Sequence, residues 1–151
     1  MVNYRQALNC IGWFDFSIVF TLHAFAAASE VGGSSIDSAQ QYWRAFRLAA
    51  IQDKISIVAD MISFPIEIRG VLDSSEHRQI ARPEFIRLFP KLLKTDPGLA
   101  PTPTTMISLV NSTPQLSPSF FNSHRNQFRI GSWVFQLKPE GWRFVQAFID
   151  E

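Results

Sequence analysis

The strongest constraint on the fold is a change in the spacing of apolar residues at about residue 63. Over residues 39–50, and again over 55–62, apolar side chains recur every three or four residues, which is the period of an amphipathic helix. From Phe64 to Ile68 they alternate with polar side chains, which is the period of a strand. Helices followed by strands in 151 residues predict one α+β domain.

Turn and capping residues divide the rest of the chain. Asp53 is placed to cap a second helix, and Pro83 is placed in the first turn of a third. Pro90 should loosen the end of that helix because it lacks a backbone donor. The predicted elements, in chain order, are helices over 37–52 and 53–62, a strand over 64–70, a polar loop over 71–80, a helix from 83, a short strand over 106–110, and an antiparallel hairpin of strands over 128–137 and 142–149.

The C-terminal hairpin has the strongest strand pattern. Pro139 presets the turn and Gly141 supplies the left-handed residue that closes it. Trp142 and Phe144 are expected on one face together with Phe148, and apolar residues on both faces predict a well-covered hairpin. Trp142 and Trp133 are expected to pack near the first helix.

The N-terminal residues have the pattern of a secretory signal. Residues 16–28 are uncharged and mainly apolar, Arg5 precedes them, and alanines spaced as at a cleavage site end them. These 13 residues are too few for a membrane-spanning helix of about 20. We therefore expect a signal peptide over 1–28, a flexible lead-in over 29–38, one domain over 39–151, no transmembrane anchor, and a periplasmic or secreted protein. The alternative is a core helix that stays on the protein.

Charge and composition exclude several classes of function. Fourteen Lys and Arg against thirteen Asp and Glu leave a net charge of +1, which is too little for a protein whose main partner is nucleic acid. One cysteine excludes an intramolecular disulfide framework, and three dispersed histidines lack metal-ligand spacing. The sequence also lacks nucleophile-elbow, phosphate-loop and dinucleotide motifs. We therefore expect no metal and no cofactor.

Two segments carry a resemblance to a known family. They are Tyr42-Trp43-Arg44-Ala45-Phe46-Arg47 continuing through Asp53-Lys54 to Phe64-Pro65-Ile66, and Gly131-Ser132-Trp133-Val134-Phe135 with Gly141-Trp142-Arg143-Phe144. Together they resemble the NTF2-like (cystatin-like α+β) superfamily over residues 39–148. The resemblance implies N-terminal helices packed on a curved antiparallel sheet, which form a cone with a cavity. The superfamily contains cavity enzymes and non-catalytic binding modules, so the fold does not give the function.

The candidate site is an apolar pocket between the first helix and the sheet. Its aromatic candidates are Trp43, Phe46, Phe64, Phe85, Phe89, Trp133 and Phe135, which either fill the core or line the pocket. Glu67 and Arg69 share one strand face and are the plausible polar pair. They orient a ligand if that face lines the cavity, and they are an ordinary surface pair if it faces solvent. No catalytic residue is assigned.

Three functions follow as hypotheses. The leading one is a non-catalytic exported module that binds an unknown protein or a small apolar ligand, with a homodimer through the sheet as one arrangement. The second is a small cavity enzyme, of lyase or isomerase type, that uses Glu67 and Arg69. The third is an inhibitor or immunity-type protein that acts through its Pro-rich loops over 95–105 and 111–126.

One helix face is also notable for its charge. Arg87, Lys91 and Lys94 follow one another at helical spacing. They form a solvated face, or a contact for an acidic protein or anionic lipid headgroups.

Overall fold

The computed structural model describes residues 35–70, 77–98 and 104–149. The helices of this part are α1 (Ser35–Ile51), α2 (Ile55–Asp60), α3 (Arg82–Leu92) and α4 (Met106–Ser112), with a short 3-10 turn, η1 (Pro118–Phe120). Its strands are β1 (Ile62–Gly70), β2 (His77–Ile80), β3 (Gln127–Ile130), β4 (Trp133–Lys138) and β5 (Gly141–Ile149). The predicted α+β class is confirmed. The predicted signal peptide over 1–28 lies outside the described residues.

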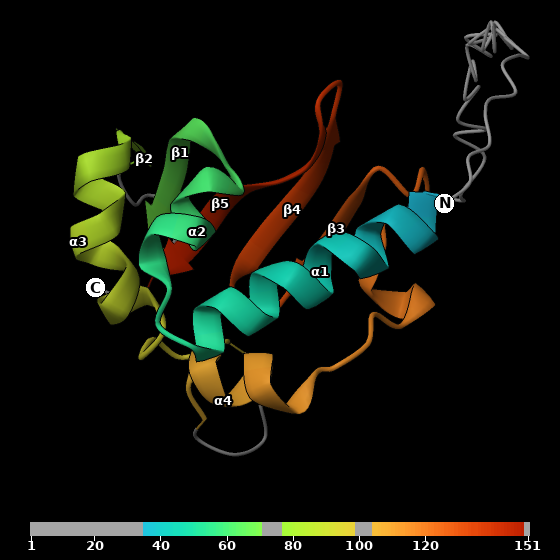
Figure 1. The fold of residues 1–151 in the computed structure, drawn as a ribbon, viewed down its shortest axis with the longest axis horizontal. Coiled ribbons are helices and arrows are strands. Elements are labelled where there is room, and N and C mark those ends of the chain that lie inside the picture. Colours follow the sequence, from blue (N-terminus) through green and yellow to red (C-terminus); the bar gives the residue numbers. More distant parts are fainter. Residues whose placement is uncertain (1–34, 71–76, 99–103, 150–151) are drawn as a thin grey trace, which may run out of the picture. The chain divides into compact units, whose positions relative to one another are not determined.

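The five strands form one sheet in the order β2-β1-β5-β4-β3 (Figure 1). Neighbouring strands are antiparallel except for β1 and β5, which run parallel. The sheet is therefore mixed rather than wholly antiparallel as expected. A parallel pair needs a long crossover connection, and the chain between β1 and β5 supplies one because it contains α3, α4 and three further strands.

Pro65 lies within β1, which is an inner strand of the sheet. The Phe64–Pro65 peptide bond is cis. The pairing of β1 with β5 shifts register between Ile62 and Glu67, and its pairing with β2 stops at Ile66. Pro65 therefore sits where neither ladder requires a backbone donor, which is why an inner strand tolerates it.

Both helix boundaries near the N-terminal end of the domain differ from prediction. Helix α1 begins at Ser35, so residues 35–38 are its first turn rather than a flexible lead-in. Asp53 does not cap α2, and the prediction was wrong on this point. Its backbone is left-handed (φ 55°), while Asp53 N–H donates to Ala50 O and Lys54 N–H donates to Ala49 O. This pair of bonds is a Schellman motif that ends α1.

Two other elements were mispredicted. Residues 106–112 form α4 instead of a strand, because the hydroxyl of Thr105 accepts a hydrogen bond from Ser108 N–H and caps a helix there. Strand β2 lies in the predicted polar loop and pairs with β1. Only Ile80 of β2 is buried, so this edge strand has no apolar alternation to reveal it.

The C-terminal region is a three-stranded meander rather than a single hairpin. Gly131, with a left-handed φ of 54°, breaks the expected strand over 128–137 into β3 and β4. Val134 opposes Gln146 and Phe135 opposes Phe144, so Val145 is an extra, bulged residue.

The bulge reverses the facing of the residues that follow it. Ala147 is fully buried, and Phe148 lies on the face opposite Trp142 and Phe144 instead of beside them. The guanidinium carbon of Arg129 lies 4.8 Å from the centre of the Phe148 ring. The expectation that Phe148 shares the face of Trp142 was therefore wrong.

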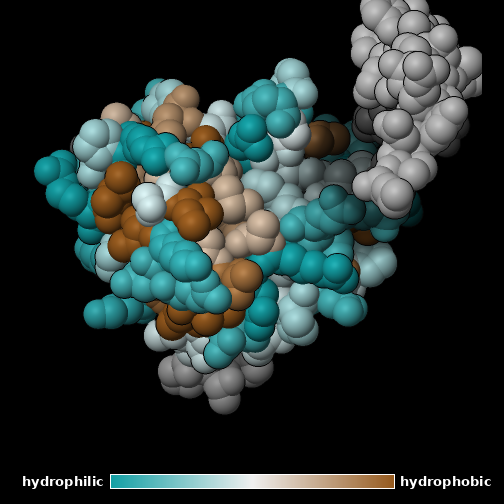
Figure 2. Space-filling model, viewed as in Figure 1, coloured by the Kyte–Doolittle hydropathy of each residue, from teal (hydrophilic) through white to brown (hydrophobic). Residues whose placement is uncertain are grey.

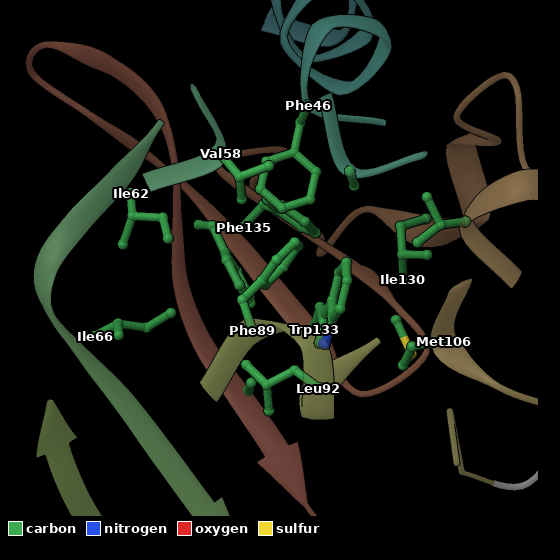
Figure 3. Close-up of a cluster of buried hydrophobic side chains, with 14 of the residues drawn as sticks. Phe46, Val58, Ile62, Ile66, Phe89, Leu92, Met106, Ile130, Trp133 and Phe135 are labelled. Carbon is green, nitrogen blue, oxygen red and sulfur yellow. The ribbon is translucent and has the colours of Figure 1, made fainter. Parts of the chain in front are cut away.

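The hydrophobic core lies between the helices and one face of the sheet. Figure 3 shows Phe46 of α1, Phe89 of α3, and Trp133 and Phe135 of β4 pointing toward one another. Ring centres lie 5.1 Å apart for Phe46 and Phe135, and 5.7 Å apart for Phe89 and Trp133. Contacts at these distances are typical of edge-to-face and offset aromatic packing.

Candidate functional site

Six of the seven aromatic candidates belong to this core. Trp43, Phe46, Phe85, Phe89, Trp133 and Phe135 each have no exposed surface. Phe64 is partly buried, with its ring centre 5.9 Å from that of Phe85. The structure thus brings the candidates together as mutually packed side chains, and none of them lines either of the two surface hollows described below.

One buried polar atom in this aromatic cluster, the indole nitrogen of Trp133, lacks a hydrogen-bond partner among the described residues. Trp133 is fully buried, and within the same residues the hydroxyl of Ser132 also has no hydrogen-bond partner. An unpaired buried donor costs about 1–3 kcal/mol. The neighbouring indole of Trp43, in contrast, donates to Thr113 O over 2.8 Å.

The polar pair lies on the other face of the sheet. Glu67 follows the buried Ile66 in β1 and therefore points away from the core. Its Oε1 accepts a hydrogen bond from Arg69 Nε over 2.7 Å and lies 3.2 Å from Nδ1 of His77 on β2. The three side chains are 28%, 38% and 53% exposed in that order, so they form a surface cluster outside the aromatic core.

A hollow of about 240 Å³ adjoins Glu67 on this outward face. It lies where the pairing of β1 with β5 shifts register and where Val145 bulges out of β5. Such irregularities open a sheet locally. The residues that line the hollow are Ser63, Pro65, Glu67, Gln79, Gln136, Lys138, Val145 and Gln146.

Most of the lining is polar and without an internal partner. Among the described residues, the side-chain amides of Gln79, Gln136 and Gln146 make no hydrogen bond, and the ammonium of Lys138 makes no ion pair. These groups offer amide donors, amide acceptors and a positive charge to a binding partner. The sequence prediction missed them because β2 and the bulge, which bring them together, leave no periodic pattern.

A second hollow, of about 510 Å³, lies between the first turns of α1 and the β4–β5 turn. Tyr42 and Trp142 contribute to its wall, and Leu137 is 38% exposed beside it. The hydroxyl of Tyr42 donates to Met61 O over 2.7 Å, and burial raises the pKa of this phenol well above its usual range. The phenol of Tyr42 is therefore uncharged and hydrogen-bonded to Met61 O at pH 7.

The Pro-rich loop over 111–126 is held against α1 by side chains. Arg47 donates from Nε to Val110 O and from Nη2 to Asn111 O, over 2.8 and 2.7 Å. The Gln40 amide oxygen accepts from Leu116 N–H over 2.7 Å. Farther along, Asn122 Nδ2 donates to Asn126 Oδ1 over 2.7 Å and closes the turn at the tip. Of the other Pro-rich loop, residues 99–103 lie outside the described part.

The basic stripe is only partly helical. Arg87 and Lys91 are exposed on α3, whereas Lys94 follows the end of that helix. Pro90 lies inside α3, which nevertheless continues to Leu92.

Comparisons with protein-family models, curated proteins and solved structures found no match. In the part of the chain that the structure describes, no group of three or more His, Cys, Asp or Glu side chains is arranged to hold a metal ion. No helix among these residues is long and apolar enough to cross a bilayer.

Proposed function

We propose that this chain is an exported, non-catalytic protein-binding module of NTF2-like shape, which binds its partner through the outward face of the sheet. The observation that carries the proposal is the polar hollow beside Glu67, on a face that none of the described helices covers (Figure 1). Three unpaired amides and one unpaired ammonium there favour a partner rich in hydrogen-bonding and acidic groups.

The same observations lower the support for the other ligands and for catalysis. A small apolar ligand would need space among the core aromatic side chains, but these side chains are buried and already pack against one another. A cavity enzyme needs an acid or base in a dry site, but Glu67 keeps 28% of its side chain exposed beside an open hollow. If the native protein turned over a substrate, and Glu67→Gln abolished this turnover without unfolding the protein, the cavity-enzyme hypothesis would be supported instead.

A homodimer through the sheet is a less favourable use of this face. In a two-fold dimer the same patch meets itself. The described outward face carries three cations, Arg69, Arg129 and Lys138. Its acid Glu67 is already paired with Arg69, so this face is positively charged. A heterologous partner with acidic groups avoids placing these cations opposite one another.

Export rests on the sequence alone. The apolar run over 16–28 and the alanines that end it support cleavage and a periplasmic or secreted location. N-terminal sequencing of protein from a Gram-negative host should begin near Ala27 or Ser29. Intact Met1 in a soluble cytoplasmic fraction would contradict export.

The binding proposal is tested by capture from the periplasm and medium of the source cells. The double variant Gln136→Ala/Gln146→Ala alters the hollow, and Gln41→Ala/Gln52→Ala is its matched control because both positions are exposed outside the sheet and outside the 111–126 loop. We expect the native chain and the control to retain the same protein, and the hollow variant to lose it. Equal recovery by all three would contradict binding through the sheet.

A second candidate is an inhibitor or immunity-type protein. The fixing of the 111–126 loop by Arg47, Gln40 and the Asn122–Asn126 pair favours it, because a preordered loop loses less entropy on binding. In the same capture experiment His124→Ala/Arg125→Ala, at the tip of this loop, would then be the variant that loses the partner.

A further inference from the structure

Large exposed hydrophobic side chains gather on the helical side of the domain. The described residues contain five: Leu48 (53%), Ile51 (37%), Ile57 (46%), Ile86 (36%) and Leu137 (38%). The first four belong to α1, α2 and α3, and Figure 2 shows hydrophobic surface over these helices. We call these four residues the helical patch. Single exposed aliphatic residues are normal, but a group on adjoining helices indicates a contact surface.

The three helices that carry the patch adjoin one another, since α2 contacts both of the others. Arg82, in the first turn of α3, reaches α2 and contacts Asp60 Oδ1 over 2.6 Å. Ile86 lies one turn after Arg82 and so shares the side of α3 that faces α2. On α1, Leu48 and Ile51 follow Arg44 at helical spacing, so the three form one exposed stripe.

The same helices, and the turn between α1 and α2, also carry positive charges without internal partners. In the described part of the chain, the exposed cations Arg44, Lys54, Arg87 and Lys91 form no ion pair. Two acids of the same helices are already neutralised, because Asp60 pairs with Arg82 and Glu84 pairs with Arg78 over 2.7 Å. Asp53 is the remaining acid near the patch.

We propose that the helical patch docks on a bilayer surface that carries anionic lipid headgroups. Exposed aliphatic side chains on helices that also expose unpaired Lys and Arg match the boundary between acyl chains and negatively charged headgroups. Patch residues line neither of the two surface hollows described above, and a bilayer, unlike a partner helix, needs no groove to dock on. This contact leaves the outward face of the sheet free, so it is separate from the proposed partner binding.

The test is flotation of the full chain with phosphatidylcholine vesicles, with and without phosphatidylglycerol. The apolar run over 16–28 gives the same background in every variant, so differences between variants report on the patch. Arg87→Gln/Lys91→Gln should weaken binding to the anionic vesicles by about fivefold per charge. Leu48→Ser/Ile57→Ser should also weaken it, whereas Leu137→Ser, an exposed aliphatic position outside the patch, should not.

Thermal unfolding of each variant separates loss of binding from loss of fold. If the serine double variant does not fold, the charge double variant alone decides, since it changes only exposed side chains. Equal binding by the native chain and the charge variant would overturn the proposal. So would equal binding to neutral and anionic vesicles, or a salt-sensitive dimer formed through the patch in the absence of lipid.

Discussion

The indole N–H of Trp142 donates a hydrogen bond to the hydroxyl of Ser38 over 3.0 Å. This contact joins the start of β5 to the first turn of α1, across 104 positions of sequence. The indole ring is 3% exposed and packs 5.1 Å from the ring centre of Phe128. One side chain therefore ties the C-terminal strands to the first helix, as the sequence predicted for Trp142.

Replacement of Trp142 should destabilise the domain strongly. Trp142→Ala removes a buried ring and should lower the free energy of unfolding by about 3–5 kcal/mol. Ser38→Ala removes the acceptor of this bond and also the hydrogen bond that the Ser38 hydroxyl donates to Ser35 O, and should cost about 1–2 kcal/mol. Urea denaturation measures both, and a loss below about 1 kcal/mol for Trp142→Ala would contradict the burial of this ring.

Gly131 and Gly98 form a matched pair for testing the β3–β4 turn. Both have left-handed backbones, with φ of 54° and 79°. A Cβ at Gly131 would lie 2.7 Å from Leu109 Cδ2 and 2.8 Å from Pro97 Cβ, whereas at Gly98 it would meet nothing within 4 Å. Gly98→Ala should cost about 1–2 kcal/mol of backbone strain, and Gly131→Ala a further 1–3 kcal/mol or so from the clash. Equal losses in thermal unfolding would argue against close packing of this turn.

Tyr42 should not ionise in the folded protein at pH 10. Burial raises its pKa above the ordinary value of 10.0, whereas Tyr42 in the unfolded chain ionises near that value. The folded state therefore favours the protonated phenol, and the stability it contributes is complete below about pH 10 and is lost as the pH rises further. In ultraviolet titration, Tyr42→Phe should therefore give the same absorbance change near pH 10 as the native protein. A smaller change in Tyr42→Phe would show that Tyr42 ionises there and is accessible.

Arg47 should control the mobility of the segment around Thr113. Arg47→Ala removes two hydrogen bonds to backbone carbonyls and should cost about 1–2 kcal/mol, chiefly by local opening. Hydrogen exchange over residues 110–116 should become faster while exchange in β4 and β5 is unchanged. Arg44→Ala is the control, because Arg44 is exposed and makes no such bond in the described residues. Similar exchange in both variants would mean that Arg47 does not anchor the loop.

The parts of the fold that local periodicity specifies were predictable. Trp43 and Phe46 lie on the buried stripe of α1, Ile66 and Ile68 on the buried face of β1, and Pro139 in the turn before β5. In each case the residue's own neighbours in sequence determine which way it faces. The same reasoning singled out the aromatic candidates, which pack against one another in the structure, and left open whether they fill the core or line a pocket.

The missed features depend on residues far apart in sequence. The bulge at Val145 exists only in relation to Val134 and Phe135 of the neighbouring strand, and it decides which face receives Phe148. Strand β2 is specified by its pairing with β1 rather than by apolar alternation. The hollow on the sheet depends on both features, so its glutamines could not be grouped from the sequence.

The most direct test of the central claim is photocrosslinking from the outward face of the sheet. A photoreactive amino acid at Gln136 lies in the polar hollow, and the same residue at Gln41 lies on an exposed position of α1 as the control. In the source cells we expect a discrete adduct of constant mass from position 136 and none from position 41. An adduct from position 41 alone, or the same adduct from both, would contradict partner binding through the sheet.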